Sequence, residues 1–362
     1  MIETQSGVDM SALVGWMDEQ GLGAGPVSTV TTLTGGTQNI LLRFTRDGRD
    51  YVLRRPPAHP RPESNETMRR EARLLAALAG TGVPHPALIA ACGDESVLGA
   101  AFYLMEPIEG FNPTSGLPPL HAGSAEVQHR MGLSMVEALV ALAAVDYRAV
   151  GLADFGKVDG WLERQVGRWR KQLDSYTAFA EWPGLQSLGS VESVAEWLER
   201  NRPADFRPGI LHGDYHLANV MFRNDSGELA AVIDWELATI GDPLVDLGWM
   251  LATWPEEQEE PMVSVRPWIG FPSAAELVAH YRALSGRDFD ADWYAIFGCY
   301  KLGILLEGTF ARACAGKAPK EVGDKLHARA QWLLSRASRW MKNGTPANKR
   351  AQEETQGGCD NE

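Results

Sequence analysis

Apolar and polar positions follow different spacings in the two parts of the chain. Near the N-terminus, apolar residues alternate with polar ones in short runs bounded by glycine-containing turns, which is typical of strands. Two segments in this part instead have apolar residues three and four positions apart, which is typical of helices. The strands are expected at residues 27–33, 40–44, 51–53, 87–91 and 101–105, and the helices at residues 10–17 and 65–79.

Beyond residue 107 the spacing is mainly helical. The expected helices lie at residues 124–146, 160–180, 243–254, 273–284, 292–314 and 320–342. The last twenty positions are polar and lack apolar periodicity, so they are predicted to be disordered. The pattern therefore predicts an α+β protein with a β-rich lobe at residues 1–107, a mainly helical lobe at 108–342 and a disordered tail at 343–362.

One hairpin is predicted inside the helical part. Apolar runs at residues 220–222 and 229–233 flank a turn-forming Asn-Asp-Ser-Gly sequence. Polar side chains stand at the open end of this hairpin, because Asp214 and Asn219 precede its first strand and Asp234 follows its second. Since paired strands bring these ends together, we expect the three side chains to converge.

A trio of this kind suits phosphoryl transfer. Mg²⁺ prefers hard oxygen ligands and keeps coordination positions for phosphate oxygens, so a carboxylate and an amide oxygen are common protein ligands. A second carboxylate, held off the metal, can orient an attacking hydroxyl group and accept its proton.

The whole motif resembles the catalytic region of the aminoglycoside phosphotransferase and choline kinase superfamily. It reads His-Gly-Asp from His212, then Asn219 after four more residues, then Ile-Asp-Trp-Glu from Ile233. The stretch IDWELATIGDPLVDLG is similar to the kinase-like domain of fused acyl-CoA dehydrogenases. The resemblance covers residues 27–333 and implies a two-lobed protein-kinase-like fold.

The resemblance also implies roles for the residues of the motif. Asp214 is expected to be the catalytic base that orients the acceptor hydroxyl, and Asn219 and Asp234 are expected to hold Mg²⁺. His216 is expected either near the γ-phosphate of ATP or in a structural role in the loop. In the helix that follows, Asp246 is expected to brace the catalytic loop through backbone N–H groups.

A second set of residues is expected to bind the nucleotide. Gly35, Gly36, Thr37 and Asn39 match the short loop that positions phosphates in these enzymes, where glycine lets backbone N–H groups approach phosphate oxygens.

Three further nucleotide contacts follow from the order of the motifs. Arg54 stands in the third strand where these folds usually carry lysine, and it keeps the positive charge in a fork-shaped group. Glu71 on the next helix matches the acid that pairs with this basic residue. At the hinge between the lobes, the Glu106 carbonyl and the Ile108 N–H are expected to bind adenine.

Composition narrows the class of protein. A hydrophobic fraction of 44% and a charged fraction of 22% are those of a globular protein, and 362 residues can bury a sizeable core. The net charge of −13 disfavours nucleic acid and anionic membranes as partners. Four cysteines without metal or disulfide spacing, and an N-terminus without signal-peptide features, favour the cytoplasm.

The predicted function is ATP- and Mg²⁺-dependent transfer of phosphate to a hydroxyl group of a small molecule. The resemblance to fused dehydrogenases points to a hydroxyacyl-CoA as acceptor. Two alternatives stay open, namely an aminoglycoside or macrolide antibiotic as acceptor and a catalytically silent nucleotide-binding protein. Arg54 in place of lysine is the feature that favours the silent protein, and the sequence does not predict the oligomeric state.

Overall fold

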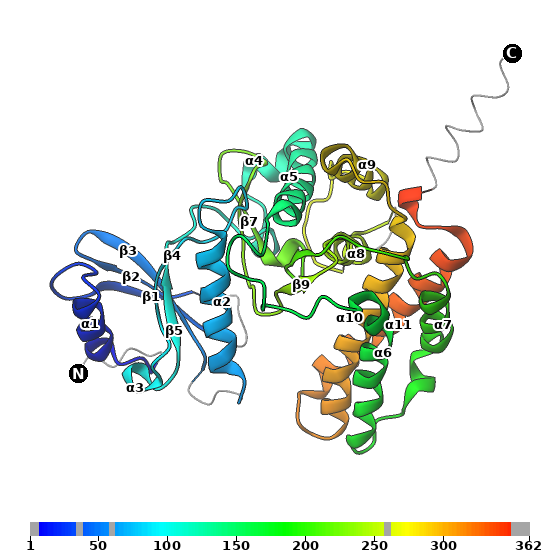
Figure 1. The fold of residues 1–362 in the computed structure, drawn as a ribbon, viewed down its shortest axis with the longest axis horizontal. Helices are drawn as coiled ribbons and strands as arrows, with labels where there is room; N and C mark the ends of the chain where they lie inside the picture. The colour runs from blue at the N-terminus through cyan, green and yellow to red at the C-terminus, as the bar shows by residue number, and fades with distance from the viewer. Residues whose placement is uncertain (1–6, 34–38, 58–61, 257–261, 349–362) are drawn as a thin grey trace, which may run out of the picture.

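A computed structural model describes residues 7–33, 39–57, 62–256 and 262–348, and it has a β-rich and a helical part (Figure 1). The β-rich part holds an antiparallel five-stranded sheet with the strand order β1-β2-β3-β5-β4. Its strands are β1 (Ser28–Thr32), β2 (Ile40–Arg46), β3 (Arg49–Arg55), β4 (Leu88–Cys92) and β5 (Phe102–Met105). The expected strands and the α+β class are confirmed, while the division into lobes at residue 107 stays a prediction.

Helices cover both faces of the sheet. Side chains along each strand point alternately to the two faces, so each contacts the helix on its own side. Helix α1 (Met10–Glu19) packs on one face with Leu53 of β3 and Leu104 of β5. Helix α2 (Ser64–Leu78) lies on the other face, where the neighbouring residues Arg54 and Tyr103 contact it. Since successive strand residues point to opposite faces, the sheet presents two polar groups to α2 without exposing them.

Helix α2 is also fixed to the helical part, and Figure 1 shows it between the sheet and the rest of the chain. Arg70 donates hydrogen bonds to the carbonyl oxygens of Phe155 and Ala238, at 3.1 and 3.2 Å. Arg73 donates to the Gly151 carbonyl at 2.7 Å. Because these carbonyls belong to the helical part, the position of α2 is set from both sides.

The helical part is built around two helices that approach closely. A Cβ atom on Gly248 would lie 2.2 Å from the Tyr294 carbonyl, and one on Gly298 would lie 2.5 Å from the Gly248 carbonyl. Only glycine permits this contact between α8 (Leu244–Thr253) and α10 (Ala291–Cys314). The other helices are α3 (Glu95–Leu98), α4 (Pro119–Gly123), α5 (Ala125–Ala144), α6 (Trp161–Asp174), α7 (Val191–Arg200), α9 (Ala274–Ser285) and α11 (Lys320–Asn343).

Two short ribbons lie among these helices. The predicted hairpin is confirmed as β7 (Val220–Phe222) paired antiparallel with β8 (Leu229–Val232). A second ribbon, β6 (Gly209–Leu211) with β9 (Thr239–Gly241), and helix α7 were not predicted. Strands of three residues are too short to show a two-residue period, and β6 and β9 lack the intervening turn sequence that predicts β7 and β8. Within the described residues, no helix has the length and apolar character needed to cross a bilayer.

The predicted disordered tail begins too early in the sequence. Thr345 and Ala347 are buried, and the Thr345 N–H donates to Asp292 at 3.0 Å. The prediction of disorder is therefore wrong for residues 343–348, because two buried side chains after a helix are too few to produce a periodic pattern. Residues 349–362 lie outside the described residues.

Candidate active site

The loop at residues 212–219, expected to be the catalytic loop, connects β6 to β7 and is bound by Asp246 of α8. The Asp246 carboxylate accepts hydrogen bonds from the N–H groups of His212 and Gly213, at 2.6 and 2.9 Å. Gly213 has φ +88°, and a Cβ atom there would lie 2.5 Å from the Leu237 carbonyl. The loop thus needs glycine at this position, and the expected bracing contact of Asp246 is present.

Asp214 lies in this loop in a half-buried position. Its Oδ1 is 3.1 Å from His216 Nε2, and its Oδ2 accepts from Asn219 Nδ2 at 2.9 Å. Burial alone would raise the pKa of Asp214, but the hydrogen bond from His216 and the positive charge of Lys301 lower it to about 2. The carboxylate is therefore ionised at neutral pH.

His216 points its second nitrogen back into the loop. The Ala218 N–H donates to His216 Nδ1 at 3.1 Å. Since a backbone N–H can only donate, the neutral ring must carry its proton on Nε2, which faces Asp214. His216 therefore orients the carboxylate, and this contact favours the structural role over a place near the γ-phosphate.

Arg54 joins the sheet, helix α2 and the end of the hairpin. Its Nε lies 2.8 Å from Glu71 Oε2, and its Nη2 lies 2.8 Å from Asp234 Oδ1. The Tyr103 hydroxyl donates to the same Glu71 carboxylate at 2.7 Å. Burial alone would lower the pKa of Arg54, but the charges around it, first that of Glu71, raise it. The predicted Arg54–Glu71 pair is formed, and its extension to Asp234 was not predicted.

Asp234 ends the hairpin in a conformation that few non-glycine residues adopt. Its φ is +64°, a strain that costs about 1–3 kcal/mol and is common at functional sites. The Ile233 N–H donates to the Asn219 carbonyl at 2.9 Å. Asp234 is the next residue after Ile233, so its backbone lies close to that of Asn219. Because Asn219 also contacts Asp214, the backbone places all three residues at the open end of the hairpin, while the convergence of their side chains stays a prediction.

The side chains around Asp234 offer oxygen donors that fit a divalent cation. Carboxylate oxygens of Glu71, Asp234 and Glu236 lie within 4.8 Å of one another. Asn219 uses its amide nitrogen to bind Asp214, which leaves its amide oxygen for another partner. Burial, followed by the charge of Asp234, raises the pKa of Glu236 to about 7. Hard oxygens of this kind suit Mg²⁺, while the assignment of Asn219 and Asp234 as its ligands stays a prediction.

The expected nucleotide contacts at the loop and the hinge are only partly described. Gly35, Gly36 and Thr37 lie outside the described residues, while Asn39 directly precedes β2. The Glu106 N–H donates to the Ala87 carbonyl at 2.9 Å, and its side chain pairs with Arg49 at 3.0 Å. Contacts of adenine with the Glu106 carbonyl and the Ile108 N–H stay predictions.

The segment after the hinge is tied to the catalytic hairpin. Phe111 and Phe222 exchange backbone hydrogen bonds of 2.9 Å. Asn112 Nδ2 donates to the Ala218 carbonyl at 2.6 Å. A Cβ atom on Gly110 would lie 2.3 Å from the Phe222 carbonyl, so the close approach of the two segments requires glycine.

Two polar residues of the site were missed from the sequence. Tyr103 donates to Glu71, and Lys301 of α10 donates to the Gly213 carbonyl at 2.8 Å. Lys301 is the one charged residue of the apolar stretch at residues 293–306, and this signal could have identified it, since charged groups are buried only when they have partners.

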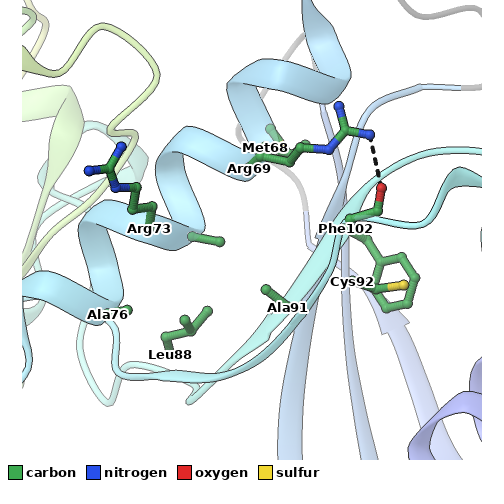
Figure 2. Close-up of a pocket in the computed structure, with 10 residues that line it drawn as sticks. Met68, Arg69, Arg73, Ala76, Leu88, Ala91, Cys92 and Phe102 are labelled. Atoms are coloured by element: carbon green, nitrogen blue, oxygen red, sulfur yellow. Dashed lines mark hydrogen bonds between the residues drawn. The ribbon is translucent and has the colours of Figure 1, made fainter. Parts of the chain in front are cut away.

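A groove of about 280 Å³ between α2 and β4 is a separate feature (Figure 2). Ala76, Leu88 and Ala91 line it, and the Arg69 side chain crosses one end to donate to the Gly93 carbonyl at 2.8 Å. None of the acidic residues of the site line it, so this groove is distinct from the candidate active site.

Comparisons with known proteins agree with this geometry. The model of the phosphotransferase enzyme family matches residues 29–267. Acyl-CoA dehydrogenase family member 10 of Mus musculus is 32% identical over 278 residues, which are 75% of this chain and 25% of that protein. Acyl-CoA dehydrogenase family member 11 of Gallus gallus is 31% identical over 311 residues, 82% of this chain and 38% of that protein. The chain thus spans well under half the length of these relatives.

Solved structures show the same fold. A protein of Ralstonia eutropha, named provisionally as an aminoglycoside phosphotransferase, has a TM-score of 0.75 at 29% identity and covers 92% of this chain and 99% of its own. A variant of aminoglycoside phosphotransferase APH(4)-Ia, in complex with ADP and hygromycin B, has a TM-score of 0.56 at 17% identity, covering 92% of this chain and 100% of its own. The second likeness concerns the fold alone. The chain belongs to the phosphotransferase enzyme family, with the two-part kinase-like fold of the aminoglycoside phosphotransferases.

Proposed function

We propose that the chain transfers the γ-phosphate of ATP to a hydroxyl group of a small molecule in a Mg²⁺-dependent reaction. The observation that carries the proposal is the placement of Asp214, Asn219 and Asp234 at the open end of the hairpin, with Arg54 bound to Asp234. This arrangement supplies an acceptor for a hydroxyl proton, oxygen ligands and a fixed positive charge in one place.

Asp214 orients the acceptor hydroxyl group. With its pKa lowered to about 2, the carboxylate is a weak base but a constant hydrogen-bond acceptor. Transfer of a phosphoryl group proceeds through a loose transition state, in which the position of the nucleophile matters more than early removal of its proton. The hydrogen bonds from His216 and Asn219 fix the direction of the carboxylate for that purpose.

Arg54 and the hairpin hold the nucleotide end of the reaction. Arg54 presents its guanidinium group to the phosphates, and Glu71 keeps that group extended from β3. Asn219 and Asp234 would hold Mg²⁺, which neutralises the charge of the phosphate oxygens when bound. The loop at Gly35, Gly36, Thr37 and Asn39 is proposed to cover the phosphates, and the Glu106 and Ile108 backbone to bind adenine.

The acceptor proposed for this site is a hydroxyacyl-CoA. The relatives named above are acyl-CoA dehydrogenases of which this chain matches a part, and a kinase acting on a hydroxylated acyl thioester would share their substrate class. Arg168 of α6 is exposed, and its charge helps to lower the pKa of Lys301 behind the catalytic loop. We propose that Arg168 attracts the phosphates of such an acceptor, which a polycationic aminoglycoside does not carry.

Turnover assays test the proposal. The purified chain is supplied with Mg²⁺ and ATP against hydroxyacyl-CoAs, aminoglycosides, macrolides and small amino alcohols, and ADP formation is measured. We expect acceptor-dependent ADP formation with a hydroxyacyl-CoA, and its loss in Asp214→Asn with ATP binding retained. Asp225→Asn, in the exposed hairpin turn, is the matched control and should leave turnover unchanged. Equal turnover in Asp214→Asn and the unaltered chain would refute the role of Asp214.

A further inference from the structure

Lys301 is a buried cation whose only hydrogen bond among the described residues goes to the catalytic loop. Its Nζ atom lies 4.3 Å from the centre of the Trp249 ring and 5.5 Å from the centre of the Trp169 ring. Its Nζ donates to the Gly213 carbonyl at 2.8 Å, and the residue is 8% exposed. Burying an ammonium group is costly, so a lysine at this place needs a reason beyond filling space.

The bonded carbonyl belongs to the peptide unit that joins Gly213 to Asp214. The N–H of the same unit, that of Asp214, donates to His212 Nδ1 at 3.3 Å. The preceding peptide unit is held by Asp246, which accepts from the Gly213 N–H. Both peptide units before Asp214 are therefore fixed, and without Lys301 the unit nearest Asp214 would be held at its N–H only.

The fold places Lys301 for this contact. Asp246 stands two residues before Gly248 on α8, and Lys301 stands three residues after Gly298 on α10. The contact of the two helices at these glycines brings the carboxylate and the ammonium group to the same turn of the catalytic loop. The charge of Lys301 also acts on the Asp214 carboxylate and lowers the pKa of that group.

We infer that Lys301 is a positioning residue, whose ammonium group fixes the Gly213–Asp214 peptide unit and thereby the direction of the Asp214 carboxylate. The effect on turnover rests on the proposed phosphotransferase function. The effect on the loop does not, because it concerns a backbone contact that exists in the resting chain.

The surroundings of Lys301 make the contact sensitive to pH. Burial is the largest influence and lowers the pKa of Lys301 to about 8, against the charges of Asp246 on α8 and Asp214 in the loop. Arg168 on α6 lowers it further. Below this pH the ammonium group holds the carbonyl through a charge-assisted hydrogen bond, and above it the neutral amine holds it more weakly. The catalytic loop should therefore loosen as the pH rises from 7 to 9.

The test compares Lys301→Met with Lys317→Met. Methionine keeps the length of the side chain and packs well between aromatic rings, so the first variant should fold. Lys317 is an exposed lysine 5.5 Å from the ring of Phe179, and its removal leaves the catalytic loop untouched. Backbone hydrogen–deuterium exchange and steady-state kinetics are measured for both variants.

We expect Lys301→Met to speed exchange in residues 209–219 by about tenfold, without a comparable change in α7 or α11, and to lower kcat by about 10- to 100-fold with the KM for ATP within about twofold. Lys317→Met should change neither quantity. In the unaltered chain, exchange in residues 209–219, corrected for its intrinsic pH dependence, should rise between pH 7 and 9, and Lys301→Met should abolish that rise.

Unchanged exchange in residues 209–219 of Lys301→Met would overturn the inference. A uniform increase over the whole helical part would also overturn it, since that result describes a residue that only supports the core. If the unaltered chain consumed no ATP with any acceptor, the proposed function would fail while the exchange experiment still decided the role of Lys301.

Discussion

The buried contact of Glu71 with Arg54 offers the sharpest prediction about stability. Glu71 is 1% exposed, and its carboxylate meets Arg54 Nε at 2.8 Å and the Tyr103 hydroxyl at 2.7 Å. Glu71→Gln keeps the size of the side chain and removes its charge. Asp234, at 2.8 Å, then remains as a charged partner of the Arg54 guanidinium group.

The magnitude follows from these contacts. Removing one partner of a buried ion pair costs about 3–5 kcal/mol. Asp234 still compensates Arg54, and glutamine still offers Tyr103 one oxygen, so we expect a loss of ~3 kcal/mol in the free energy of unfolding at pH 7. With about 2.1 cal/mol/K of unfolding entropy per residue over 362 residues, this loss lowers the Tm by about 4 °C if the chain unfolds as one unit.

The assay is thermal and urea unfolding of Glu71→Gln beside a control on the same helix. Glu66 is exposed and lies 3.9 Å from Arg69, so Glu66→Gln should cost less than about 0.5 kcal/mol. A Glu71→Gln variant as stable as Glu66→Gln would refute the reasoning, because it would mean that the buried pair contributes no more than a surface pair.

Three further predictions concern the loop, the acceptor and pH. Asp246→Asn leaves one of the two loop N–H groups with a neutral amide oxygen as acceptor and turns an NH2 donor toward the other, so it should lower kcat by roughly 10- to 100-fold, measured by ADP formation. Arg168→Glu should raise the KM for a hydroxyacyl-CoA by roughly tenfold and leave the KM for ATP unchanged. The same KM for the hydroxyacyl-CoA in the variant and the unaltered chain would contradict a phosphate-bearing acceptor. Burial raises the pKa of Asp242 to about 6, so the folded state binds more protons there and the residue lowers stability as pH rises from 4 to 6. Asp242→Asn should remove that slope, whatever its absolute Tm, in unfolding curves across this range.

Patterns in the sequence predict those parts of the site that rest on local structure. The hairpin could be predicted because two apolar runs flank a turn-forming sequence, and the hairpin in turn predicts that Asp214, Asn219 and Asp234 meet. The resemblance to the family adds the partner of Arg54 and the brace at Asp246. The structure has the contacts of Asn219 with Asp214, of Arg54 with Glu71 and of Asp246 with the loop, while the meeting of Asp234 with Asp214 stays a prediction.

Contacts between distant segments could not be predicted in the same way. Lys301 contacts Gly213, 88 positions earlier in the sequence, and Arg54 contacts Asp234, 180 positions later. No periodic pattern in the sequence predicts either contact. The ribbon of β6 and β9 escapes prediction because each strand has three residues and its pairing depends on the fold around it. Thr345 is buried and binds Asp292 of α10, a contact that depends on how the helices pack and not on the local sequence.

Calorimetric titration of the chain with ATP, in the presence and absence of Mg²⁺, tests the central claim most directly. We expect the unaltered chain and Asp225→Asn to bind ATP at least about tenfold more tightly with Mg²⁺, a gain of about 1.4 kcal/mol. Asp234→Asn should lose that gain, because it removes the carboxylate proposed to hold the metal. Absence of ATP binding by the unaltered chain, or an undiminished effect of Mg²⁺ in Asp234→Asn, would contradict the account.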